Sequence, residues 1–136
     1  MPQLSHKFRD LRLTDEVSIV YSARKGVRPA TFYLFSSSIE MPEKNLAALL
    51  NVHPRTINNY RDNNKPLNPV EGEHLLKLIY LFSTGEEVFG SIAQFTQWLN
   101  TSDSAKKEKP IEWLATPGGV DLVTDEVARL SHGNPV

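Results

Sequence analysis

Cysteine is absent from the 136-residue chain. This absence excludes a disulfide framework, thiolate metal sites and cysteine nucleophiles, and it suits a reducing compartment such as the cytoplasm. Long apolar runs are also missing, since no window approaches the roughly 18 consecutive apolar residues that a membrane span requires. The N-terminal stretch MPQLSHKFRDLRL lacks the apolar segment of a signal peptide. We therefore expect a cytoplasmic protein without membrane attachment.

Motifs for catalysis and metal binding are missing as well. The four histidines are scattered along the chain: His6, His53, His74 and His132. None has a second histidine or a carboxylate at metal-ligand spacing, so surface or helix-cap roles are expected for them. There is no G-x-S-x-G elbow, P-loop or dinucleotide fingerprint, and Glu86 and Glu87 diverge by about 100° on a helix. The sequence predicts a non-enzymatic chain with no metal or cofactor.

Charge is nearly balanced overall but unevenly distributed along the chain. With 40% hydrophobic and 23% charged residues, the composition is typical of a globular protein rather than a disordered one. Residues 1–67 carry ten Lys or Arg against six Asp or Glu, whereas residues 68–136 carry five against ten. A cationic segment suits contact with phosphate, and an anionic segment suits a basic protein partner. An ordinary solvated surface explains an excess of four charges equally well.

Helical periodicity dominates the chain. Apolar residues at Leu13, Val17, Val20 and Tyr21, with acids before and bases after them, mark a first helix over 13–23. The same reasoning gives further helices over 30–39, 69–89, 91–100, 111–114 and 120–130. The long helix after Asn68 has a capping box and an apolar stripe, so it should be the central packing element. Because no alternating run supplies partner strands, we predict an all-α fold.

The stretch 42–62 predicts a helix-turn-helix. Pro42 begins a helix that Asn51 ends, and Pro54 begins the next one after a three-residue turn. Six apolar residues can face one core: Leu46, Leu49, Leu50, Val52, Ile57 and Tyr60. Polar residues of the second helix then point outward, where Arg and Asn can pair with guanine and adenine edges. The predicted DNA contacts are Arg55, Thr56, Asn58, Asn59 and Arg61, with Lys65 on a phosphate.

The C-terminal stretch predicts a charged loop, a short helix IEWL, a turn ATPGG and a last helix. Gly118 and Gly119 are expected in that turn, and Gly133 as the stop of the last helix. Six apolar residues of this stretch are expected in the core: Trp113, Leu114, Leu122, Val123, Val127 and Leu130.

Three stretches make the chain resemble the Xre/MbcA/ParS family of antitoxins: LAALLNVHPRTINNY, GEEVFGSIAQFTQWLN and PIEWLATPGGVDLVTDEVARLSHGNPV. The last two are the more specific. Together they contain an F-G dipeptide followed by a predicted helix with the dipeptide W-L, then the pattern P-x-x-W-L-x-T-x-x-G, and finally L-x-x-G near the C-terminus. The resemblance implies an N-terminal helical region with a helix-turn-helix at 1–67. It also implies a connecting helix and a small helical toxin-binding domain at 68–136.

In function, the resemblance implies an antitoxin that covers the active site of a RES-domain, NAD-consuming toxin and represses its own operon by binding operator DNA. NAD would belong to the toxin, and a homodimer and larger complexes with toxin are expected. Toxin contacts are expected at Arg129, His132, Gly133, Asn134, Pro135 and Val136. Arg129 could equally well complement its helix dipole. The alternative hypothesis is a stand-alone dimeric helix-turn-helix repressor with no toxin partner.

Overall fold

The computed structural model describes residues 3–102 and 107–133, and regular structure in these ranges is helical. The elements are α1 (Leu4–Lys7), η1 (Arg9–Leu11), α2 (Glu16–Lys25), α3 (Pro29–Ser38), α4 (Glu43–Leu49), α5 (Pro54–Asp62), α6 (Pro69–Phe89), α7 (Ile92–Leu99), η2 (Pro110–Ala115) and α8 (Pro117–Ser131). Extended pairing within the described ranges is limited to a β-bridge between Val27 and Leu67. The predicted all-α class is confirmed.

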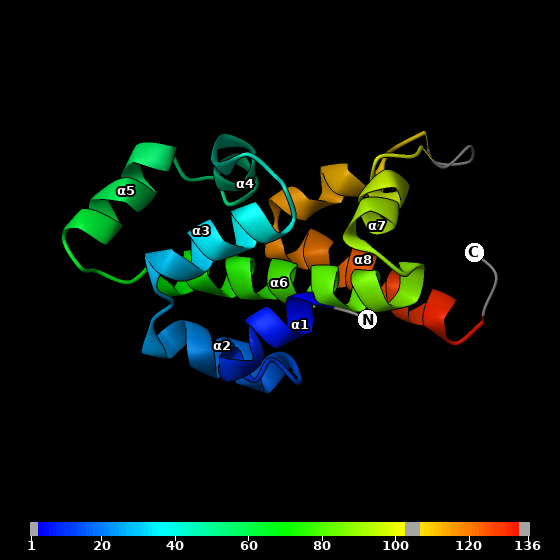
Figure 1. Ribbon diagram of the computed structural model, residues 1–136, viewed down its shortest axis with the longest axis horizontal. Helices are drawn as coiled ribbons and strands as arrows, with labels where there is room; N and C mark the ends of the chain where they lie inside the picture. Colours follow the sequence, from blue (N-terminus) through cyan, green and yellow to red (C-terminus); the bar gives the residue numbers. More distant parts are fainter. Residues whose placement is uncertain (1–2, 103–106, 134–136) are drawn as a thin grey trace.

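Helix α6 runs through the middle of the molecule, with α1 and α2 along one side of it and α3 and α4 along the other (Figure 1). It begins where the sequence predicts, because the Asn68 side chain accepts from the Glu71 amide at 2.8 Å and Glu71 accepts in return from the Asn68 amide at 3.1 Å. It ends at Gly90, whose φ of 94° is available to glycine at little cost. The central role predicted for this helix is confirmed.

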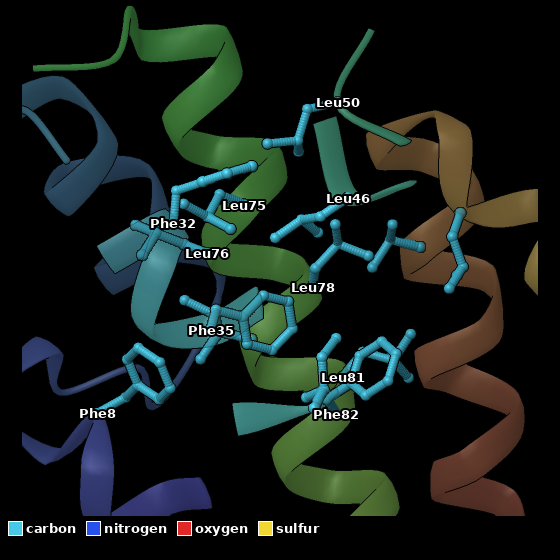
Figure 2. Packing of buried hydrophobic residues seen from close by; sticks show 14 of the residues in the cluster. Phe8, Phe32, Phe35, Leu46, Leu50, Leu75, Leu76, Leu78, Leu81 and Phe82 are labelled. Atoms are coloured by element: carbon cyan, nitrogen blue, oxygen red, sulfur yellow. The ribbon is translucent and has the colours of Figure 1, made fainter. Parts of the chain in front are cut away.

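A single hydrophobic core surrounds α6. Leu75, Leu78 and Phe82 of α6 meet Phe35 of α3 and Leu46 of α4, and all five side chains are at most 1% exposed (Figure 2). Four aromatic rings form consecutive edge-to-face contacts that connect the N-terminal segment with α3, α6 and α7. They are Phe8, Phe35, Phe82 and Phe95, with centroid separations of 6.1, 5.5 and 5.1 Å. Each such pair stabilises by about 0.5–1.5 kcal/mol beyond the burial of its area. The N-terminal helices and α7 therefore share one core.

Helix α2 begins at Glu16, three residues later than predicted, because Asp15 caps it by accepting from the Ser18 amide at 2.8 Å. Ile19 and Ala23 are its buried residues. The apolar residues that marked this helix in the sequence, Val17, Val20 and Tyr21, are exposed.

Helix α8 begins at Pro117, three residues earlier than predicted. Thr116 caps it by accepting from the Gly119 amide at 3.0 Å, so Gly118 and Gly119 form its first turn, and the predicted loop at this place is wrong. Proline with a threonine cap was sufficient to start the helix despite two glycines. Gly119 allows close packing, since a Cβ there would lie 1.8 Å from the Trp113 carbonyl oxygen.

The histidine prediction is confirmed at three positions and wrong at one, since His6 and His132 are exposed on the surface. His53 caps α5, with Nδ1 accepting from the Arg55 amide at 3.0 Å. His74 is buried at 3% exposure, with Nε2 lying 2.8 Å from the Leu114 carbonyl oxygen. The carbonyl can only accept, so Nε2 carries the proton and His74 ties α6 to η2.

Candidate nucleic-acid interface and partner groove

The helix-turn-helix consists of α4 and α5, held together by side chains buried between them. Leu46 and Ile57 are both 0% exposed, and Leu50 is 4% exposed. Asn51 closes the turn with a φ of 58°, a conformation that asparagine tolerates better than most residues. The apolar pattern predicted for this unit is confirmed, with Leu49, Val52 and Tyr60 packed at its edge. Helix α5 lies at one end of the molecule (Figure 1).

The structure places the predicted DNA-contacting side chains in two settings. Arg55, Asn59, Arg61 and Lys65 are exposed, and Thr56 is half-buried. Arg55 and Asn59 are four residues apart, so both lie on the same outer face of α5, Arg55 in its first turn and Asn59 one turn further along. In helix-turn-helix proteins, this part of the second helix is the one that reaches base edges.

Asn58 is held from inside the protein. The Tyr33 hydroxyl of α3 donates to its Oδ1, which leaves the amide nitrogen of Asn58 available for another acceptor. Burial raises the pKa of Tyr33, so its hydroxyl remains a donor at neutral pH. The Arg61 guanidinium lies 5.4 Å from the centroid of the same ring, and its Nε contacts Asp62 at 3.1 Å.

Tyr33 thus organises two side chains of α5, and sequence reasoning did not single it out. It lies in the aromatic run TFYLF, where a local pattern predicts only packing. No local signal connects Tyr33 with Asn58, which is 25 residues further along the chain.

A second surface is a groove of about 390 Å³ between α7, η2 and α8. Its apolar wall is formed by Trp98, Trp113, Leu122 and Val123, and Glu126 and Arg129 lie at its polar side.

Three residues of this groove were expected in the core, and that prediction is wrong for two of them. Trp113 is 43% exposed and Leu122 is 57% exposed, whereas Leu114, Val123 and Val127 are buried as predicted. The position of Trp113 has a packing reason, because its carbonyl lies against Gly119 at the start of α8. Two large apolar side chains side by side in one open groove form a surface suited to a protein partner.

The residues predicted to contact a partner at the C-terminus lie near this groove only in part. Arg129 is exposed and lines it. His132 and Gly133 follow the end of α8 and are exposed, with Gly133 at a φ of 77°. The remaining predicted contacts, Asn134, Pro135 and Val136, lie outside the described residues.

Polar contacts fix the groove-bearing helices to the helix-turn-helix and to α6. Asn51 donates from Nδ2 to the Ala115 carbonyl at 2.9 Å. Lys77 of α6 lies 2.8 Å from Asp121 of α8 and 3.3 Å from Glu73. Burial alone would lower the pKa of Lys77, but hydrogen bonds and the charges of both carboxylates outweigh burial and raise it. Lys77 therefore stays charged at neutral pH.

No group of three or more histidines or carboxylates within residues 3–102 and 107–133 could hold a metal ion. Over the same ranges, no helix is both long and apolar enough to cross a membrane.

A helix-turn-helix fused through one core to a small helical domain with an apolar groove defines a DNA-binding regulator with a second, protein-binding part. Two family models match the chain: the antitoxin Xre-like helix-turn-helix domain over residues 19–80, and the antitoxin Xre/MbcA/ParS C-terminal toxin-binding domain over residues 84–133. The chain belongs to the Xre/MbcA/ParS family of antitoxins, which are non-enzymatic. No curated protein matches it. The first match ends and the second begins within α6.

Proposed function

We propose that this antitoxin neutralises a RES-domain, NAD-consuming toxin by covering the active site of the toxin. The observation that carries the proposal is the groove with exposed Trp113 and Leu122, because it lies within the residues matched by the toxin-binding family model. Desolvated aromatic anchors commonly supply most of the binding energy of an interface. Arg129 at the groove and the segment from His132 to Val136 complete the proposed toxin-binding surface.

The antitoxin also represses its own operon in this proposal. As a homodimer, alone or in a larger complex with toxin, it places α5 of each copy in the major groove of the operator. Arg55 and Asn59 read base edges, Thr56, Asn58 and Arg61 support them, and Lys65 contacts a phosphate. The basic N-terminal half of the sequence supports this assignment. Both partners place the protein in the cytoplasm.

Co-expression with the product of the neighbouring gene, which this proposal expects to be a RES-domain protein, tests the toxin assignment. We expect the two proteins to copurify and cell growth to be rescued, and we expect Trp113→Ala combined with Leu122→Asp to abolish both effects. The matched control is Leu34→Asp, because Leu34 is 42% exposed on α3, away from the groove. Wild-type protein that fails to bind the neighbouring gene product would refute the toxin assignment and favour the stand-alone repressor.

Removing residues after Leu130 tests the contribution of the C-terminal segment separately. We expect the truncated protein to keep operator binding and to lose part of its ability to neutralise the toxin. A truncated protein that rescues growth fully would exclude this segment from the mechanism.

A further inference from the structure

Helix α2 presents a stripe of apolar side chains to solvent. Val17, Val20 and Tyr21 are 76%, 40% and 63% exposed, and their spacing places them on one face with Arg24. Seven large apolar side chains are exposed in the described part of the chain, and three of them belong to this ten-residue helix. A cluster of this kind marks an interaction surface more strongly than single exposed residues do.

The stripe lies on a firmly held helix. On the opposite face of α2, Ile19 and Ala23 are 4% and 2% exposed and pack toward α6. A Cβ on Gly72 of α6 would lie 3.7 Å from the Cα of Ala23, so the two helices approach closely. The capping box at Asp15 fixes the first turn of α2. The exposed face is therefore preformed and does not result from a detached segment.

The stripe forms one wall of an open groove of about 540 Å³ between α2 and α6. Its charged walls are two acids and two bases: Glu16, Arg24, Glu73 and Lys77. With two acids and two bases, this surface carries no net positive charge, whereas contact with DNA phosphates requires one. It also lies outside residues 84–133, which the toxin-binding family model matches. The two partners of the proposed function therefore leave this face free.

The charges along α2 make the face complementary to itself. Glu16 lies at one end of the stripe, Arg24 and Lys25 lie at the other, and all three side chains are exposed. A closed two-fold dimer requires a patch that matches its own copy, with each contact occurring twice. Antiparallel pairing brings the acidic end of one α2 beside the basic end of the other, whereas parallel pairing would bring like charges together.

We propose that this face is where a second copy of the chain docks, with the two α2 helices packed antiparallel across a two-fold axis. The axis passes beside Val20, so that the two Val20 side chains meet and Glu16 of each copy lies beside Arg24 of the other. The proposal locates the interface of the homodimer and thus rests on the dimeric state given under the proposed function. Lys25 lies 5.2 Å from the centroid of the Tyr21 ring, which orders both side chains for the contact.

Sedimentation equilibrium of the purified full-length protein tests the interface. We expect wild type at twice the 15.3 kDa mass of the chain. Val20→Lys should give a monomer, because it places two like charges next to the two-fold axis. Leu34→Lys is the matched control and should remain a dimer, since Leu34 is 42% exposed and Val20 is 40% exposed. Circular dichroism establishes that each variant is folded.

Exchanging the charges of α2 distinguishes loss of ion pairs across the interface from disruption of the α2 fold. Glu16→Arg alone and Arg24→Glu alone should each weaken the dimer several-fold, and the double variant should recover it. A monomeric wild type, or a dimer unaffected by Val20→Lys and by both single charge variants, overturns the proposed interface. Toxin capture by wild type is measured in parallel, so failure of the interface proposal and failure of the toxin assignment give different results.

Discussion

Gly85 of α6 lies against the ring of Phe95 of α7, so closely that a Cβ on Gly85 would stand 2.5 Å from two atoms of the ring. Phe95 is 0% exposed and stacks with Trp98 at a centroid distance of 6.0 Å. Trp98 in turn lines the groove proposed to bind toxin. The glycine therefore sets how closely α7 approaches α6, and with it the position of one wall of that groove.

Gly85→Ala should destabilise the protein by roughly 1–3 kcal/mol, because the added methyl group forces the buried ring out of its place. This is the opposite of the usual effect inside a helix, where alanine is favoured over glycine by about 1 kcal/mol. Urea unfolding followed by circular dichroism measures the change. Toxin capture should weaken as well, since Trp98 moves together with Phe95.

Gly118→Ala is the matched control for the preceding variant. Gly118 also lies in a helix, but a Cβ there would meet no atom within 4 Å. We expect unchanged or slightly higher stability. Equal stability changes in the two variants would contradict the packing role of Gly85.

Replacing Arg55 and Asn59 by alanine should weaken operator binding by roughly 1–3 kcal/mol for each side chain that pairs with a base edge. Both side chains are exposed on one face of α5, so the fold should be unaffected. Fluorescence anisotropy at fixed salt measures DNA affinity, and copurification measures toxin binding. Arg129→Ala is the reciprocal control, expected to impair toxin binding and leave DNA binding intact. Unchanged DNA affinity of the Arg55 and Asn59 variants would remove α5 from the interface.

Tyr33→Phe tests whether Asn58 is held in place for DNA. The variant removes only the hydroxyl that donates to Asn58, which costs about 0.5–1.5 kcal/mol of stability. We expect operator affinity to fall several-fold, because the Asn58 amide becomes free to rotate. Tyr80→Phe on α6 is the control for removal of a hydroxyl away from α5. If Tyr33→Phe is less stable but keeps wild-type affinity, the contact is structural only.

Local signals in the sequence predicted where most helices begin and end. Asn68 with its capping box and Gly90 with its positive φ act within one turn of chain, so their effect does not depend on distant contacts. The helix-turn-helix was also predictable, since its apolar spacing specifies how Leu46 and Ile57 meet. The first turn of α8 was missed because two glycines outweighed Pro117 in reasoning from composition.

Burial of particular side chains was harder to predict. On α2, the spacing of Val17, Val20 and Tyr21 is as helical as that of Ile19 and Ala23, and only the close approach of α6 decides which face is buried. The same holds in the C-terminal part, where the exposure of Trp113 and Leu122 depends on how α8 packs on η2. The contact between Tyr33 and Asn58 was likewise invisible to local patterns. The candidate surfaces are defined by such contacts between distant segments.

His74 should make the stability of the protein depend on pH. Burial lowers the pKa of His74 below its ordinary value of 6.5, and the hydrogen bond to Leu114 opposes this only in part. The folded state therefore favours the neutral ring. The stabilisation is fully present above about pH 6.5, where the unfolded chain is neutral too, and it is lost as the pH falls toward the folded-state pKa.

The free energy of unfolding should therefore decrease on acidification below about pH 6.5, with a slope from this residue of at most about 1.4 kcal/mol per pH unit. His74→Gln keeps a donor for the Leu114 carbonyl but cannot gain a proton, so its stability should change less over the same interval. Urea unfolding of both proteins at matched ionic strength measures the difference between the two slopes. Parallel pH profiles for wild type and variant would show that protonation of His74 does not destabilise the fold, whereas a flatter profile for the variant assigns the loss to the junction between α6 and η2.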